Sequence, residues 1–171
     1  SGVYYMKFVT DVLIVAPAIA GTILAASRFW DAVSDPLIGY LSDRTRSKYG
    51  RRRSWMFFAA VPMGLSLISI WSPPDGLSEF QLVIWLALGL LIYETVQTAY
   101  FVPHGSLGVE LTFDYHERTR LYGLSHMIGI FGVAAGLFSL ELMDSAEDKR
   151  QFAFFLSIFA GIAISSSVLV T

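Results

Sequence analysis

Apolar segments of about 20 residues, the length that a helix needs to cross the hydrocarbon core of a bilayer, follow one another along the whole chain. Short polar links separate them. The segments are Val3–Ala20, Thr22–Leu41, Ser54–Trp71, Gln81–Leu107, Leu121–Leu142 and Phe152–Thr171. We therefore predict an all-α membrane protein in which residues 1–171 form one bundle of six transmembrane helices.

The charged residues are concentrated in the links, and their signs predict an orientation. Ser42–Arg53 carries six basic residues and one acidic residue, and the positive-inside rule places such a link in the cytoplasm. The link after the third segment contains Asp75 and Glu79 and no basic residue, so we expect it on the opposite side. Alternation then predicts that Thr112–Arg120 is cytoplasmic and that Glu141–Asp148 is not.

Composition supports the membrane class and narrows the range of functions. The chain is 54% hydrophobic and 15% charged, with a mean hydropathy of +0.57, whereas soluble domains carry about 25% charged residues. It has no cysteine, so neither disulfides nor thiolate metal sites are available. We expect membrane lipids, and no nucleic acid, as partners. The sequence offers no nucleophile beside a base and no phosphate loop, so we expect neither enzyme activity nor a cofactor.

An acidic pair, Asp31 and Asp35, lies inside the second apolar segment. A charge near the centre of a bilayer costs at least about 2.5 to 3.5 kcal/mol, so such a pair suggests a functional site. The four-residue spacing places both carboxylates on one helix face, where they can share a cation or a proton. Pro36 leaves the carbonyl of Ala32 without its helical partner, and Ser27 adds a hydroxyl. Hard cations prefer such oxygen ligands.

A simpler structural role is also open for the acidic pair. Asp31 can form an ion pair with Arg28, one helical turn earlier, and so merely neutralise that basic residue. This alternative leaves Asp35 without an explanation.

The fourth and fifth segments contain further polar residues. Glu94, Gln97 and Thr98 give the fourth segment a polar face, either for a ligand or for hydrogen bonds between helices. His126 lies within the fifth segment, where it can carry a proton, donate to a solute or serve as a satisfied polar group.

Three motifs resemble those of known transporters. The link GYLSDRTRSKYGRRR, Gly39–Arg53, resembles the loop between the second and third helices of the major facilitator superfamily. WDAVSDP, Trp30–Pro36, and ELTFDYHERTRL, Glu110–Leu121, are similar to motifs of the glycoside-pentoside-hexuronide:cation symporters. The resemblance covers essentially the whole chain and implies one half of a fold with two six-helix halves. We therefore expect a truncated first helix here and a second six-helix half in the full-length protein.

The resemblance also implies roles for individual residues. Asp31 and Asp35 match acids that bind the coupling cation, Na⁺ or H⁺, and would be the metal ligands if the cation is Na⁺. Thr98 matches a fourth-helix residue at the same site, and we expect Ser27 to assist there. The residues that match the cytoplasmic gate are Asp43, Arg44, Gly50, Arg51 and Arg52.

The solute is less well defined by the resemblance. We expect Glu94, Gln97, Phe101 and His126 to face it. Phe101 stands where the melibiose-transporting members have a sugar-binding aspartate, and His126 stands where they have an arginine. These departures disfavour a galactoside and leave a different glycoside or another amphiphilic solute.

Together these observations predict a secondary active transporter that couples Na⁺ or H⁺ to the symport of a glycoside-like solute. We expect a multi-pass protein of the plasma membrane, in bacteria the inner membrane. The alternatives are a transporter of a non-sugar amphiphilic solute, a channel or receptor-like bundle, and an inactive or structural half-transporter fragment.

Overall fold

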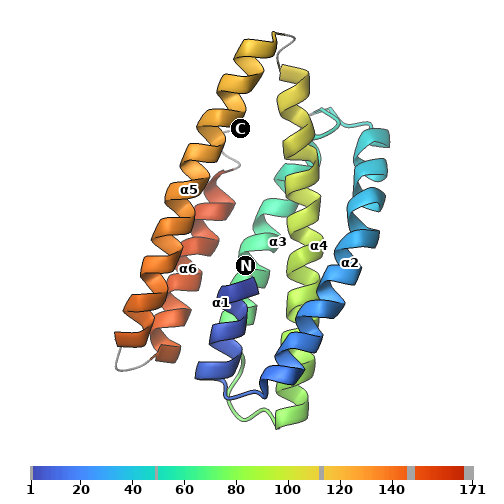
Figure 1. Ribbon diagram of the computed structural model, residues 1–171. Coiled ribbons are helices and arrows are strands. Elements are labelled where there is room, and N and C mark those ends of the chain that lie inside the picture. Colours follow the sequence, from blue (N-terminus) through green and yellow to red (C-terminus); the bar gives the residue numbers. More distant parts are fainter. Residues whose placement is uncertain (1, 49, 112–113, 146–148, 168–171) are drawn as a thin grey trace.

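The structure is a computed structural model that describes residues 2–48, 50–111, 114–145 and 149–167. Within these ranges every regular element is a helix: α1 (Gly2–Lys7), the π-helix η1 (Phe8–Val12), α2 (Pro17–Arg44), α3 (Arg53–Trp71), α4 (Glu79–Leu111), α5 (Tyr115–Ser145) and α6 (Lys149–Ser167). The long helices stand side by side and are connected at the two ends of a bundle (Figure 1). The prediction of an all-helical chain is confirmed.

The prediction of one continuous helix over Val3–Ala20 is wrong. The chain turns between η1 and α2, where Ile14 has a φ of 57° and Ala16 has an extended ψ of 130°. Pro17 occupies the first turn of α2, where its missing N–H costs nothing, and it disfavours the helical conformation at the residue before it. Because the residues on both sides of the turn are apolar, hydropathy shows no boundary there, and α2 begins before the predicted Thr22.

Side-chain caps explain where α4 and α5 begin. The backbone N–H of Ser78 donates to Gln81 Oε1 at 3.0 Å, and the N–H of Gln81 donates to Ser78 Oγ at 3.4 Å, which forms a capping box. Asp114 Oδ1 accepts the N–H of His116 at 2.7 Å at the start of α5. Most of the predicted link Thr112–Arg120 is therefore helical, which corrects that boundary, and its first two residues lie outside the described part of the chain.

The link between α5 and α6 is also shorter than predicted. The sequence predicts that one apolar segment ends at Leu142 and the next begins at Phe152, but α5 continues to Ser145 and α6 begins at Lys149. Residues 146–148 lie outside the described ranges, as do the last four residues of the predicted sixth segment. Charged residues near a helix end are compatible with helical structure, so charge alone made both predicted helices too short.

The helices α3 and α4 form the frame on which the bundle is built. α3 packs extensively against α4 and α6, and α2 packs against α4. One buried apolar cluster joins η1, α2, α3, α4 and α6 and includes Phe8, Val9, Ala20, Ile23, Ile70, Leu86, Leu90 and Ala153. A second cluster joins Met56, Ala59, Ala60 and Met63 of α3 to Tyr100 of α4. The side chains on the α2-facing side of α4 are therefore held on a firmly packed helix.

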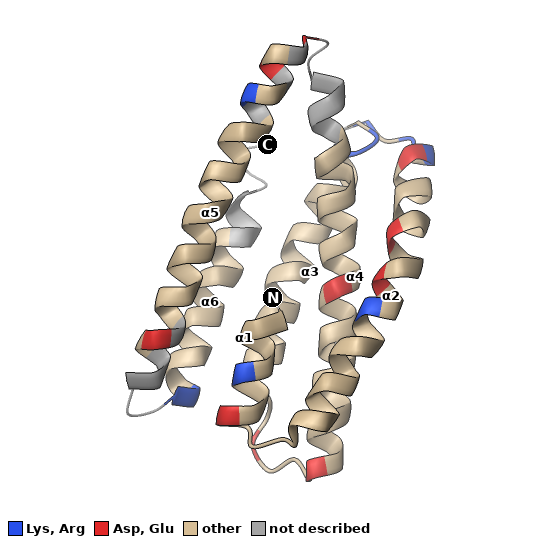
Figure 2. Ribbon diagram, in the orientation of Figure 1, with Lys and Arg blue, Asp and Glu red and all other residues tan. Residues whose placement is uncertain are grey.

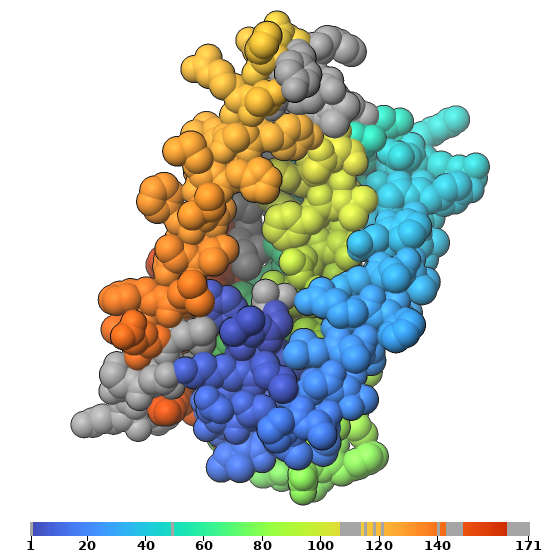
Figure 3. All heavy atoms as spheres, viewed as in Figure 1, coloured from blue at the N-terminus to red at the C-terminus, as the bar shows by residue number. Residues whose placement is uncertain are grey.

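By contrast, α5 makes few contacts with the rest of the bundle. The space-filling view shows that this face of the molecule is hollowed between α5 and the neighbouring α4 (Figure 3). Most of the described side chains of α5 are exposed, and many of them are large and apolar. An apolar surface of this kind requires a cover of lipid or protein.

Among the described residues, three helical stretches are long and apolar enough to cross a membrane: Arg53–Trp71, Glu79–Ser106 and Tyr122–Ser139. They belong to α3, α4 and α5 and agree with three of the predicted spans. α2 has 28 residues, but charged residues in its middle lower its hydropathy. Multi-pass membrane character is therefore supported, whereas the full number of six spans stays a prediction.

The links alternate between the two ends of the bundle as predicted. The basic link between α2 and α3 lies at the same end as the connection from α4 to α5 (Figure 1). At the opposite end, Arg150 Nη1 lies 2.6 Å from Asp75 Oδ1 and so joins the acidic link to the start of α6. That the basic end faces the cytoplasm stays a prediction.

Candidate functional site

Charged residues occur at the middle of α2 and of α4, far from the helix ends (Figure 2). We name this polar contact between the two helices the α2–α4 seam. It consists of Arg28, Trp30, Asp31 and Asp35 of α2 and Glu94, Thr95 and Thr98 of α4. Residues three or four apart share one face of a helix, so these spacings present both sets along the same seam.

Asp35 is joined directly to the fourth helix. Thr98 Oγ1 donates a hydrogen bond of 2.9 Å to Asp35 Oδ1. Thr98 is 7% exposed, so its hydroxyl is held in a largely dry part of the bundle. The sequence predicts this contact between the acidic pair and Thr98, and the contact is confirmed. The role of the pair in binding a cation stays a prediction.

Asp31 forms the ion pair that the structural alternative predicts. Arg28 Nη1 lies 2.9 Å from Asp31 Oδ2, and the same guanidinium reaches toward α4, with Nη2 4.0 Å from Glu94 Oε1. Asp31 Oδ1 and Glu94 Oε1 are buried and have no hydrogen-bond partner among the described residues. The ion pair therefore satisfies only part of the acidic charge of the α2–α4 seam.

The charges of the α2–α4 seam do not balance. Three carboxylates, of Asp31, Asp35 and Glu94, face one guanidinium, so the fully ionised cluster has two negative charges in excess. In a region of low dielectric this excess attracts a cation strongly. All of the unpaired atoms are oxygens, which suit a hard cation such as Na⁺ or a proton. Among the described residues no group of three or more His, Cys, Asp or Glu side chains converges as a metal cage.

Ser27 lies on the buried face of α2, one turn before Asp31. Its side chain is fully buried, and its Oγ donates to the carbonyl of Leu24 at 2.9 Å. Ser34, on the same face, points its Oγ at the carbonyl of Asp31, 3.5 Å away. A hydroxyl that donates to the backbone keeps lone pairs that can accept or coordinate. The structure thus places Ser27 beside the α2–α4 seam but shows no direct contact with either acid.

The predicted solute residues are not brought together as one group. Gln97 lines a cavity of about 540 Å³ between α1, α3, α4, α5 and α6, and its Oε1 has no hydrogen-bond partner in the described part of the chain. Phe101 is 52% exposed and packs edge-on against Tyr100, with ring centroids 5.3 Å apart. His126 is exposed on α5, and no hydrogen bond or ion pair of the described residues joins it to Glu94.

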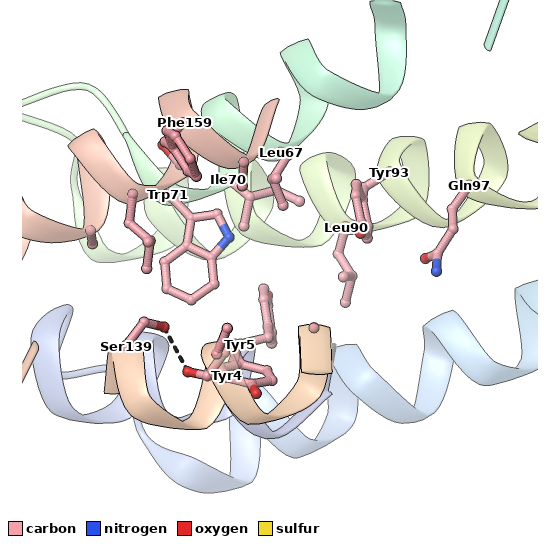
Figure 4. A pocket seen from close by; sticks show the side chains of 17 residues that line it. Tyr4, Tyr5, Leu67, Ile70, Trp71, Leu90, Tyr93, Gln97, Ser139 and Phe159 are labelled. Atoms are coloured by element: carbon pink, nitrogen blue, oxygen red, sulfur yellow. Dashed lines mark hydrogen bonds between the residues drawn. The ribbon is translucent and has the colours of Figure 1, made fainter. Parts of the chain in front are cut away.

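The cavity beside Gln97 is mainly apolar. Figure 4 shows Gln97 at one end and Trp71 toward the other, with tyrosine side chains from α1 and α4 between them. Its lining includes Tyr4, Tyr5, Leu67, Ile70, Leu90, Tyr93, Ala153 and Phe159. The two sides of α4 therefore differ, since one side faces α2 with charged groups and the other faces an apolar space.

The predicted gate residues gather at the basic end of the bundle. Arg52 Nη2 lies 3.1 Å from Asp43 Oδ1 and so ties the end of α2 to the start of α3. The guanidinium of Arg44 lies 4.3 Å from the centre of the Tyr40 ring. Gly50 has a φ of 94°, which a residue with a side chain rarely adopts, and the exposed Arg51 follows it. An ion pair thus joins the two helices across the described part of this link, and the role of these residues as a gate stays a prediction.

Sequence reasoning missed two features of the α2–α4 seam. Trp30 Nε1 donates to Thr95 Oγ1 at 2.7 Å, a second bond between the helices, and nothing in the spacing pairs these residues. Arg28 was expected only as a neutraliser of Asp31, although it also faces Glu94. The recurrence of polar residues every three or four positions in both helices was the available signal that the two faces meet.

Comparisons with known proteins agree with the motifs. A family model described as MFS/sugar transport protein matches residues 1–171. The chain is 37% identical over 152 residues to "Uncharacterized symporter sll1374" of Synechocystis, covering 86% of this chain and 28% of that protein. It is 34% identical over 140 residues to "Inner membrane symporter YicJ" of Escherichia coli, covering 82% of this chain and 30% of that protein.

Another relative comes from a vertebrate. The chain is 30% identical over 136 residues to "Sodium-dependent lysophosphatidylcholine symporter 1-A" of Danio rerio, covering 79% of this chain and 25% of that protein. The chain thus spans less than a third of the length of each of these three relatives. On the match over its whole length and the likeness to named symporters, this chain belongs to the MFS/sugar transport protein family.

Proposed function

We propose that this chain is part of a secondary active transporter that couples Na⁺ or H⁺ to the symport of a small solute. Asp31 and Asp35 bind the cation, with Thr98 as a further oxygen ligand and Ser27 beside them. The observation that carries the proposal is the bond from Thr98 to Asp35, one helical turn after Asp31, whose buried Oδ1 has no hydrogen-bond partner among the described residues. Acidic side chains of α2 and a hydroxyl of α4 thus lie along one contact between two helices.

The proposed solute is a glycoside, bound near Glu94, Gln97, Phe101 and His126. The description of the family as sugar transport proteins supports a sugar-like solute. Charged and amide groups in the middle of the bundle suit hydroxyl groups, and the exposed ring of Phe101 suits the apolar face of a sugar ring. These four residues contact one solute when His126 and Phe101 face the same space as Glu94 and Gln97 in the full-length protein.

A second candidate is an amphiphilic solute with an apolar tail. The sodium-dependent lysophosphatidylcholine symporter of Danio rerio is a named relative. The cavity of about 540 Å³ beside Gln97 is lined mainly by aromatic and aliphatic side chains, so it suits an apolar group better than a sugar.

The remaining parts of the proposal follow the motifs. Asp43, Arg44, Gly50, Arg51 and Arg52 act as a cytoplasmic gate that opens when two halves of the transporter rock against each other. The second six-helix half completes the transport path, and the protein resides in the plasma membrane, in bacteria the inner membrane. The relative YicJ is named as an inner membrane protein, which supports this location.

The test is uptake by the full-length protein in proteoliposomes. A panel of labelled glycosides and lysophospholipids is supplied with an inward Na⁺ gradient, with an inward H⁺ gradient or with neither. The proposal predicts that one solute class accumulates above equilibrium only with a cation gradient and that its uptake saturates. Uptake that neither gradient stimulates, or that does not saturate, contradicts it and favours a channel.

A further inference from the structure

Arg28 lies between two carboxylates on different helices, and only one of them holds it closely. Its Nη1 is 2.9 Å from Asp31 Oδ2, whereas its Nη2 is 4.0 Å from Glu94 Oε1. The side chain of Glu94 is 6% exposed, and Glu94 Oε1 has no hydrogen-bond partner among the described residues. A buried carboxylate without a donor is costly, so Glu94 attracts the guanidinium that Asp31 now holds.

We infer that Glu94 is a positioning residue that takes the guanidinium of Arg28 from Asp31 when the coupling cation binds. This inference rests on the proposed cation site. A cation bound between Asp31 and Asp35 meets a guanidinium only 2.9 Å from one of its ligand oxygens, and the two positive charges repel each other. Transfer of Arg28 to Glu94 removes the repulsion and leaves both oxygens of Asp31 for the cation.

The transfer requires a side-chain rotation and no movement of the helices. The α2–α4 seam is fixed by two hydrogen bonds, from Trp30 to Thr95 and from Thr98 to Asp35. Arg28 Nη2 must approach Glu94 by roughly 1 Å to reach the usual charge-assisted bond length of about 2.8 Å. The side chain of Arg28 is 57% exposed, so it has room to turn.

The charges explain why the transfer accompanies cation binding. Without the cation, Asp31 is paired with Arg28, and Glu94 Oε1 has no hydrogen-bond partner among the described residues. With the cation, Asp31 and Asp35 share the ion, and Glu94 is paired with Arg28. Binding on α2 therefore changes a contact on α4, the helix that also carries Gln97, and this links the cation site to the proposed solute residues.

The first experiment measures cation dependence in Glu94→Gln of the full-length transporter. The amide is similar in shape but no longer attracts the guanidinium, so Arg28 stays on Asp31 and competes with the cation. We expect the half-saturating cation concentration for uptake to rise about tenfold, the effect of one charge-assisted hydrogen bond. The control Glu79→Gln makes the same change at the exposed start of α4, and we expect no shift.

The second experiment separates positioning from direct ligation by repeating Glu94→Gln in an Arg28→Gln background. Without the guanidinium, Glu94 has nothing to remove, so the inference predicts no further rise in the half-saturating concentration. An equal rise in both backgrounds makes Glu94 a cation ligand and overturns the inference. An unchanged half-saturating concentration in the single variant overturns it as well.

One further measurement and one substitute variant keep the experiment decisive. Cation-dependent thermal stability of the purified variants reports binding without transport, because a ligand stabilises the state that binds it. If Arg28→Gln does not fold, Arg28→Lys in its place keeps the charge without the planar fork, and we then expect a smaller effect of Glu94→Gln. A wild-type protein without any cation dependence overturns the proposed function and this inference together. A cation-dependent wild-type protein whose variants do not show the expected changes in half-saturating concentration overturns the inference alone.

Discussion

The two sides of α4 differ in chemistry, although the residues on them are close in sequence. Toward α2, Thr98 and Glu94 meet acids and a guanidinium at defined distances, and two hydrogen bonds fix the helices together. Toward α5, Tyr93 and Gln97 face an apolar cavity of about 540 Å³. A small ion needs ligands at fixed positions, whereas an apolar solute needs space, so the difference between the two sides supports the proposal of an ion on the first side and the apolar part of a solute on the second.

The largest effect is expected from Asp31→Asn in the full-length protein. One carboxylate alone compensates poorly for the lost hydration of a monovalent ion, so cation-driven accumulation should be abolished. Expression should be retained, because Glu94 lies near enough to pair with the released Arg28. Accumulation assays with Western quantification test this, with Asp11→Asn, an exposed acid at the bundle end, as the control. Loss of the folded protein instead supports the purely structural ion pair.

A smaller effect is expected from Thr98→Ala. It removes the hydroxyl that donates to Asp35, and a hydrogen bond to a charged group contributes about 1.5 to 3 kcal/mol. We expect the half-saturating cation concentration to rise about tenfold or more, since about 1.4 kcal/mol corresponds to a factor of ten. Thr98→Ser keeps the hydroxyl and should stay near the wild type. Equal behaviour of the two variants contradicts a role for the hydroxyl.

On the cavity side, the expected effect is on stability. A Cβ atom placed on Gly136 of α5 lies only 2.5 Å from the hydroxyl oxygen of Tyr4, so Gly136→Ala requires the side chain of Tyr4 to move. Such overpacking typically costs about 1 to 3 kcal/mol. We expect a lower thermal midpoint in detergent and partial recovery when Tyr4→Phe is added, because the clashing oxygen is removed. A midpoint as high as the wild type's shows that α1 and α5 do not pack this closely.

The smallest effect is expected from Trp30→Phe. This change removes the hydrogen bond to Thr95 and keeps an aromatic ring, so the net cost is about 1 kcal/mol. We expect a slightly lower thermal midpoint and an unchanged half-saturating cation concentration, because Trp30 contributes no ligand. A large loss of cation affinity would mean that the spacing of α2 and α4 depends on this one bond.

The sequence predicted the polar contact between helices better than it predicted the helix ends. The contact of Asp35 with Thr98 was expected because the resemblance to the symporters implies that Thr98 belongs to the site of the acidic pair, and because a carboxylate in an apolar segment requires a partner. The turn at Ile14 was missed because apolar residues continue through it, and the start of α5 was missed because Asp114 caps a helix within a polar stretch. Hydropathy reports burial in lipid and carries little information about backbone geometry.

The second lesson concerns residues that act across helices. His126 was expected to face the solute, as was Glu94, and the structure exposes it on α5, which touches the bundle only sparsely, so its role stays a prediction. The hydrogen bond from Trp30 to Thr95 was not expected at all. Rotation of one helix about its axis decides such contacts, and that rotation is set by packing over the whole face, so a single polar residue does not predict it.

The most direct test of the cation site is Asp35→Asn, because Asp35 has no part in the ion pair with Arg28. Cation-driven accumulation and cation-dependent thermal stability are measured on the full-length protein, together with energy-independent exchange of solute. The account predicts that accumulation and cation stabilisation are lost while solute exchange survives. Normal cation dependence in a well-expressed Asp35→Asn protein would contradict the site.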